Sequence, residues 1–139
     1  MKSILVIDDC PEYRSIISTI LLDAEYDVWE ASSPDEAFAI LRVENMDMII
    51  CDLHMPFTSD ERFQEYEVSY RVGINTIKEL SGVFPFKPII AISAAPPSEL
   101  RAMTCDLGLV PALNKPFQAE ELLLVVARSF ADPLGDVVH

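Results

Sequence analysis

Residues 3–9 read Ser-Ile-Leu-Val-Ile-Asp-Asp, a short apolar run that ends abruptly in two acidic residues. Continuous apolar runs rich in β-branched side chains are typical of strands that are covered on both faces of a parallel sheet. The same pattern recurs at residues 46–51 and 88–92, and weaker candidates lie at residues 26–30 and 109–113. The sequence therefore predicts five strands.

Segments with helical spacing of apolar residues follow each of these runs. Their apolar positions are Ile16, Ile17, Ile20 and Leu21; Ala37, Phe38, Ile40 and Leu41; Ile74, Ile77 and Leu80; Leu100 and Met103; and Leu122, Leu123, Val125, Val126 and Phe130. Ser33 before Pro34 and two acidic residues is a typical helix start. Strict alternation of strand and helix predicts one α/β domain of the (βα)5 type, a doubly wound parallel sheet with helices on both faces. We expect it to span residues 1–130, with residues 131–139 as a short C-terminal tail.

The composition narrows the classes of partner. The chain has 139 residues, with 10 Lys and Arg against 23 Asp and Glu, so its net charge is −13. This acidic balance disfavours binding to nucleic acid or to anionic membranes. The N-terminal apolar run is too short to cross a membrane. Three widely spaced cysteines, of which Cys51 lies in an apolar run, favour neither a zinc site nor disulfides. The sequence reads as cytoplasmic.

Polar residues follow four of the five predicted strands. Asp8 and Asp9 come after the first strand, Asp52 after the third, Ser93 after the fourth and Lys115 after the fifth. Because ligands of open parallel sheets bind outside the carboxyl ends of the strands, we expect these side chains to converge. Three clustered carboxylates repel one another unless a hard cation such as Mg²⁺ or a lysine compensates them. A carboxylate in such a site can attack a phosphoryl group and form an aspartyl phosphate.

These residues carry a resemblance to a known family. The motifs are Asp8-Asp9, Asp52-Leu-His-Met-Pro56, Ser93-Ala94 and Lys115-Pro116, in this order at the strand ends. Together they resemble the receiver domain of two-component response regulators, of the CheY-like, stand-alone kind, over nearly the whole chain. The resemblance implies a flavodoxin-like strand order 2-1-3-4-5.

The resemblance also implies a role for each site residue. Asp52 would accept the phosphoryl group, and it would share Mg²⁺ with Asp9, with Asp8 acting mainly through water, and with the backbone carbonyl of His54. Lys115 would pair with the phosphoryl oxygens, and Ser93 would move to bond them. Pro116 occupies the position where the family has a cis peptide bond.

The implied partners are a histidine kinase or histidine phosphotransfer protein, in two-component or phosphorelay signalling, and a downstream protein target. The domain would be a signalling phosphoacceptor and no enzyme beyond catalysing its own phosphoryl transfer and dephosphorylation.

The chain departs from the family pattern in two places. Ala112 stands where the family usually has Tyr or Phe, three residues before the lysine, so the usual coupled movement of an aromatic ring is not expected. Residues 57–72 look like an insertion between the third strand and the third helix. In one interpretation the third helix extends backwards to span Ser59–Ser81, about 35 Å at ~1.5 Å per residue. Phe63, Tyr66 and Tyr70 would then form an aromatic stripe along this helix, which would favour association with a partner or a homodimer. In the other, the insertion is a loop and Gly73 breaks the helix.

Two other functions remain open at this stage. A phosphohydrolase of the haloacid-dehalogenase kind also uses an aspartate nucleophile, Mg²⁺ and a lysine, but it needs a second acid two residues after the nucleophile, where this chain has His54. A degenerate receiver would bind its partners without phosphorylation. The complete set of acidic residues with Lys115 argues against that alternative, whereas Ala112 leaves it open.

Overall fold

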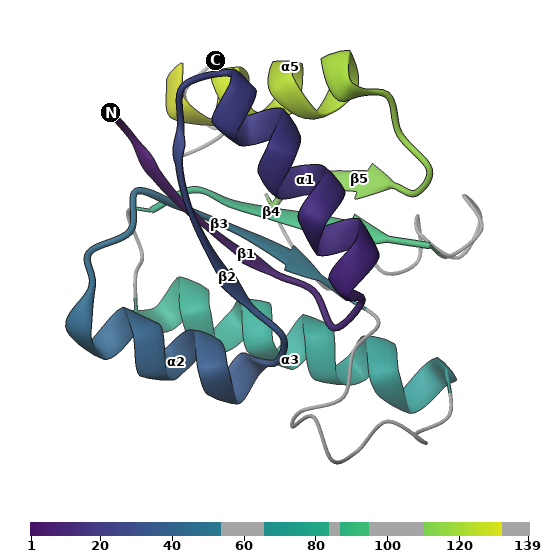
Figure 1. Ribbon diagram of the computed structural model, residues 1–139. Helices are drawn as coiled ribbons and strands as arrows, with labels where there is room; N and C mark the ends of the chain where they lie inside the picture. The colour runs from purple at the N-terminus through teal and green to yellow at the C-terminus, as the bar shows by residue number, and fades with distance from the viewer. Residues whose placement is uncertain (54–65, 84–86, 95–109, 132–139) are drawn as a thin grey trace.

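The computed structural model describes residues 1–53, 66–83, 87–94 and 110–131, with residues 66–73 as backbone only (Figure 1). Its elements are β1 (Ser3–Ile7), α1 (Pro11–Asp23), β2 (Asp27–Ala31), α2 (Pro34–Val43), β3 (Met48–Asp52), α3 (Tyr66–Val83), β4 (Ile89–Ser93), β5 (Ala112–Asn114) and α5 (Ala119–Ala131).

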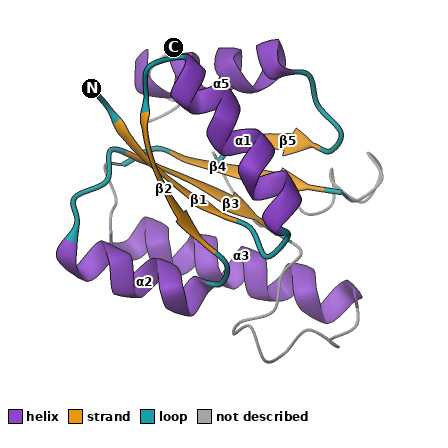
Figure 2. Cartoon of the chain, viewed as in Figure 1, coloured by secondary structure: helices purple, strands orange, loops and turns teal. Residues whose placement is uncertain are grey.

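The five strands form one sheet in the order β2-β1-β3-β4-β5, and every neighbouring pair is parallel. The predicted strand order and doubly wound parallel sheet are therefore confirmed, and the described residues contain four of the five predicted helices. All five strands point the same way, so their carboxyl ends meet at one edge of the sheet (Figure 2).

Helices cover both faces of the sheet, with α1 and α5 on one side and α2 and α3 on the other (Figure 1). Successive residues of β1 pack alternately against the two helix layers, because the side chains of a strand alternate between its faces. Ile4 and Val6 pack with α1 and α5, whereas Leu5 and Ile7 pack with α2 and α3. All four are buried, and burying one such side chain contributes about 1.5–3 kcal/mol. The central strands therefore provide a rigid support for the residues at their ends.

Most strand boundaries agree with the prediction to within two residues. β1 matches it fully, and β2 and β4 are each displaced by one residue. The largest difference is at β5, which was predicted at residues 109–113 and is observed at Ala112–Asn114. Only Leu113 of this short strand is buried, so a continuous apolar run is a poor guide to its bounds. The helix predicted around Leu100 and Met103 lies outside the described residues.

The observed start of α3 distinguishes in part between the two interpretations of the insertion, an extended helix or a loop. It begins at Tyr66 and runs through Gly73 to Val83, so the expectation that Gly73 breaks the helix is wrong. A glycine inside a helix costs only about 1 kcal/mol, which the burial of Ile74, Ile77 and Leu80 against the sheet readily offsets. The backward extension is confirmed as far as Tyr66. Its predicted continuation to Ser59 lies outside the described residues.

Within the described ranges, no helix combines the length and apolar character needed to cross a membrane.

Candidate functional site

Three aspartates meet at the carboxyl edge of the sheet. Asp8 and Asp9 directly follow β1, and Asp52 is the last residue of the neighbouring strand β3. One carboxylate oxygen from each residue lies within 4.8 Å of those of the other two. Asp8 and Asp52 are buried, whereas Asp9 is exposed. The structure thus brings together the three acidic residues that the strand-end pattern predicts.

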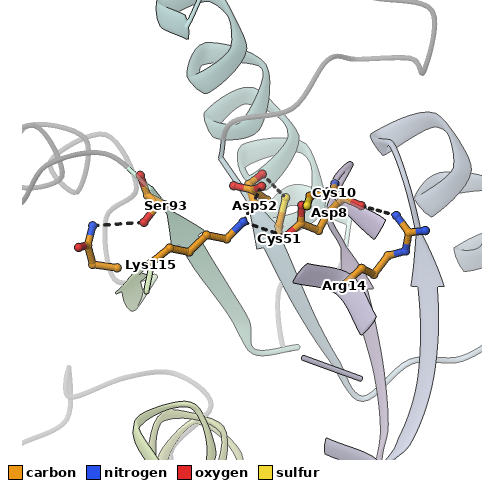
Figure 3. Close-up of polar contacts among 8 residues, drawn as sticks. Asp8, Cys10, Arg14, Cys51, Asp52, Ser93 and Lys115 are labelled. Carbon is orange, nitrogen blue, oxygen red and sulfur yellow. Dashed lines mark hydrogen bonds and ion pairs between the residues drawn. The ribbon is translucent and has the colours of Figure 1, made fainter. Parts of the chain in front are cut away.

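Lys115, which directly follows β5, reaches this cluster with its side chain. Its Nζ lies 2.9 Å from Asp8 Oδ2 and 3.1 Å from Asp52 Oδ2 (Figure 3). Burial alone would lower the pKa of the ammonium, but the carboxylates of Asp52 and Asp8 outweigh it, so the pKa of Lys115 is raised. Lys115 is therefore a fixed positive charge that bridges the ends of β1 and β3.

The path of the chain around Lys115 aims its side chain. The peptide bond between Lys115 and Pro116 is cis, as the resemblance implies. The backbone N–H of Lys115 donates to the carbonyl of Ser93, 2.7 Å away, and the side-chain amide of Asn114 donates to the same carbonyl at 3.2 Å. The ends of β4 and β5 are therefore tied together where the lysine leaves the sheet.

Ser93 is fully buried as the last residue of β4. The register places Ile92 opposite Asp52, so Ser93 lies one residue beyond the aspartate on the neighbouring strand. Its place at the carboxyl edge agrees with the prediction. His54, whose backbone carbonyl was predicted as a metal ligand, lies outside the described residues.

Asp8 is held by contacts that the sequence did not single out. Its Oδ1 accepts a hydrogen bond from the backbone N–H of Cys10 at 2.9 Å. Its backbone carbonyl accepts one from Arg14 Nη1 at 2.7 Å (Figure 3). Arg14 Nε is in turn paired with Glu30 of β2 at 2.9 Å. Arg14 therefore fastens the turn between β1 and α1 to the next strand.

The sequence analysis also missed an aromatic contact to Lys115. Tyr13 of α1 places its ring 4.2 Å from Lys115 Nζ, and the ring packs against Phe117 with centroids 5.7 Å apart. The only available signal was that Tyr13 lies four residues after Asp9, which is one helical turn.

The charges of the cluster do not cancel. Three carboxylates face one ammonium, and the pKa of Asp9 is raised, first by its partial burial and then by the negative charge of Asp8. Mg²⁺ prefers oxygen ligands and is commonly held by carboxylates with several waters retained. A divalent cation would balance the charge, because its two positive charges and the one of Lys115 would offset the three carboxylates. Asp8, Asp9 and Asp52 thus fit such an ion in chemistry and in spacing.

The family model of the response regulator receiver domain matches residues 4–127. The chain belongs to this family. The transcriptional regulatory protein ZraR of Salmonella typhimurium is 27% identical over 128 residues, which are 92% of this chain and 26% of that protein. The chain spans from about a tenth to just over half of the length of the curated relatives it matches.

Solved structures agree with this assignment. The chemotaxis protein CheY4 of Vibrio cholerae is 28% identical with a TM-score of 0.74, over 92% of this chain and 98% of that one. A CheY-like receiver domain protein from Methanospirillum hungatei has a TM-score of 0.77 at 18% identity, over 95% of both chains, and so supports the fold alone. The alternative of a haloacid-dehalogenase-like hydrolase receives no support from these matches.

Proposed function

We propose that this receiver accepts a phosphoryl group on Asp52 from a histidine kinase or a histidine phosphotransfer protein. The observation that carries the proposal is the ion pair between Asp52 and Lys115 inside a cluster of three carboxylates. Asp52 supplies a nucleophile, and Lys115 supplies positive charge beside it. Asp8 and Asp9 complete a site for a divalent cation.

The proposed reaction uses Asp52 as its nucleophile. A carboxylate oxygen of Asp52 attacks phosphorus, forming a new oxygen–phosphorus bond while the bond between phosphorus and the donor breaks. The donor, a histidine nitrogen or an acyl oxygen, leaves with the bonding electrons. Lys115 neutralises charge on the phosphoryl oxygens, which is the main contribution that a protein makes to phosphoryl transfer. Mg²⁺ held by Asp8, Asp9, Asp52 and the His54 carbonyl would supply additional positive charge at those oxygens.

Ser93 is the proposed switch of the domain. It is buried at the end of β4, next to the strand that carries Asp52. Its hydroxyl would bond a phosphoryl oxygen on Asp52 and so couple phosphorylation to the loop that follows β4. With Ala112 in place of the usual aromatic residue, we expect the signal to pass through loop or helix shifts.

The wider role would be that of a cytoplasmic receiver in two-component signalling. Residues 1–130 would form the domain and residues 131–139 a tail, and the output would be binding to a downstream protein or transfer of the phosphoryl group along a phosphorelay. CheY4 is matched over 98% of its chain, so a receiver of about this length occurs as a whole chain in a solved structure. The insertion at about residues 57–72 would provide a partner or homodimer contact.

Intact mass after incubation with acetyl phosphate tests the proposal. We expect one phosphoryl adduct that requires Mg²⁺, is released by hydroxylamine as an acyl phosphate should be, and is lost in Asp52→Asn. Asp27→Asn is the matched control, because Asp27 begins β2 at the opposite edge of the sheet and should label like the wild type.

The alternative of a receiver that acts without phosphorylation predicts a different result. No adduct with acetyl phosphate, combined with an unchanged NMR spectrum after addition of beryllofluoride and Mg²⁺, would overturn the proposal. A labelled Asp52→Asn protein would instead show that another residue is the acceptor.

A further inference from the structure

The ammonium of Lys115 has an aromatic neighbour in addition to its two carboxylates. Its Nζ lies 4.2 Å from the ring centroid of Tyr13, well inside the range at which the negative face of an aromatic ring attracts a cation. The lysine side chain is 10% exposed, so water screens this attraction only weakly. Tyr13 comes from α1, whereas the two carboxylates that pair with Lys115 lie at the carboxyl ends of β1 and β3.

The ring of Tyr13 is itself held in place. It packs on Phe117, with the two planes tilted by 57°. Phe117 lies two residues after Lys115, beyond the cis peptide bond, and both rings pack against the core layer beneath α1 and α5. The segment that carries the lysine therefore also carries a ring that orients the tyrosine.

We propose that Tyr13 is a positioning residue that holds Lys115 at the phosphorylation site. This inference rests on the proposed function. Lysine has a flexible four-carbon stem, so its ammonium needs fixed partners to stay in one place. Two of those partners, Asp8 and Asp52, are also the expected ligands of the cation. A hard cation competes for carboxylate oxygens but not for the face of a phenol ring. Tyr13 thus retains the lysine when the carboxylates are shared.

The same chain provides a matched control at the other end of the sheet. Lys2 Nζ lies 5.3 Å from the ring of Phe130, which stacks on Tyr26 at 5.8 Å. This second set has the same composition of one lysine and two aromatic rings. Because it lies beside the amino-terminal ends of β1 and β2, it can affect stability without touching the site.

The test compares phosphorylation by acetyl phosphate in Tyr13→Phe, Tyr13→Leu and the control Phe130→Leu. We expect Tyr13→Phe to match the wild type, because the ring face remains. Tyr13→Leu should lower the rate at saturating acetyl phosphate about three- to tenfold, since the lysine acts on charge in the transition state. Phe130→Leu should leave this rate unchanged.

Phenylalanines with one, two and three ring fluorines at position 13 separate electrostatics from packing. The fluorines keep the shape of the ring but withdraw electron density from its face, which weakens its attraction for the ammonium. The phosphorylation rate should therefore fall stepwise along the series. A rate independent of fluorination, or equal rates in folded Tyr13→Phe and Tyr13→Leu, would overturn the proposal.

A second readout does not depend on phosphorylation. Because Lys115 Nζ lies over the ring of Tyr13, the adjacent ε-methylene protons should resonate upfield in the wild type and in Tyr13→Phe, with the shift lost in Tyr13→Leu. A wild type that forms no adduct with acetyl phosphate and shows no NMR response to beryllofluoride would overturn the proposed function, and this shift would then decide by itself whether Tyr13 holds the lysine. An unshifted resonance in the wild type would show that it does not.

Discussion

Ser18 is a buried polar residue whose hydroxyl contributes no hydrogen bond within the described part of the chain. It lies on α1, is 5% exposed and has no partner for its Oγ among the described residues. An unsatisfied buried hydroxyl costs about 1–3 kcal/mol, and alanine is also the better helix former. Ser18→Ala should therefore raise the free energy of unfolding by about 1 kcal/mol, as measured by urea denaturation.

Thr19→Ala is the matched control on the same helix. Thr19 is exposed, and its Oγ1 donates to the Ser15 carbonyl, so we expect a change within about 0.5 kcal/mol. A lower stability of Ser18→Ala than of the wild type would mean that the hydroxyl makes a favourable contact in solution.

The site residues show what a sequence can reveal at this scale. Asp8, Asp9, Asp52 and Lys115 were predictable, because each follows a strand and the ends of parallel strands meet at one edge. Tyr13 was not, since its contact with Lys115 depends on how α1 is rotated and on the path of the chain after β5. Spacing along the sequence contains neither quantity, and the same reason hid the link from Arg14 to Glu30.

The start of α2 is an element whose sequence signal and structure agree in detail. Ser33 has extended backbone angles, and its side chain accepts a hydrogen bond from the backbone N–H of Glu36 at 3.3 Å. Pro34 follows at the first helical position, where a missing N–H costs nothing. Removing the cap should weaken the helix, so Ser33→Ala should lower the free energy of unfolding by about 1 kcal/mol in urea denaturation.

Ser33→Thr serves as the conservative control, because threonine keeps the capping hydroxyl and suits an extended backbone. Equal losses in the two variants would assign the effect to packing around this buried position. A wild-type stability in Ser33→Ala would show that the cap contributes nothing.

Whole elements were predictable to the extent that burial is continuous along them. β1, β3 and β4 are buried on both faces over nearly their full length, so their apolar runs mark them clearly. β5 has three residues and one buried side chain, which is too little pattern to fix its bounds. The start of α3 was open because a glycine disfavours a helix locally, while the burial of its later turns favours it.

At the scale of the whole molecule, charge opposes folding. The chain carries a net charge of −13, and three of its carboxylates are gathered at one edge of the sheet beside a single ammonium. Folding brings these groups together, whereas unfolding separates them. The cost is greatest where burial is added to repulsion, and the raised pKa of Asp9 reflects both causes.

The raised pKa of Asp9 fixes the direction of the pH dependence. Between its ordinary pKa and the raised pKa of the folded state, the folded protein binds more protons at this residue than the unfolded chain does. Stability from Asp9 is therefore complete below the ordinary pKa and is lost as the pH rises through the folded one. At neutral pH the ionised Asp9 destabilises the fold.

Replacing Asp9 removes this cost together with a ligand for the cation. Without Mg²⁺, Asp9→Asn should raise the Tm by about 2 to 4 °C at about pH 7, a modest gain because partial exposure of Asp9 weakens the effect. The gain should be smaller at about pH 4, because the wild-type carboxyl is then more fully protonated. In the wild type, Mg²⁺ at about tenfold its dissociation constant should add about 1.4 kcal/mol, and Asp9→Asn should lose most of this gain. Thermal unfolding with and without Mg²⁺ measures both effects.

Asp27→Asn changes the net charge by the same amount at the other edge of the sheet. If it raised the Tm as much as Asp9→Asn does, the gain would come from overall charge and not from the cluster. If Asp9→Asn retained the full stabilisation by Mg²⁺, Asp9 would not be a ligand. We expect Asp9→Asn to be more stable than the wild type without Mg²⁺ and to gain less stability when Mg²⁺ is added. Both results are expected together only when the same carboxylate destabilises the fold and binds the metal.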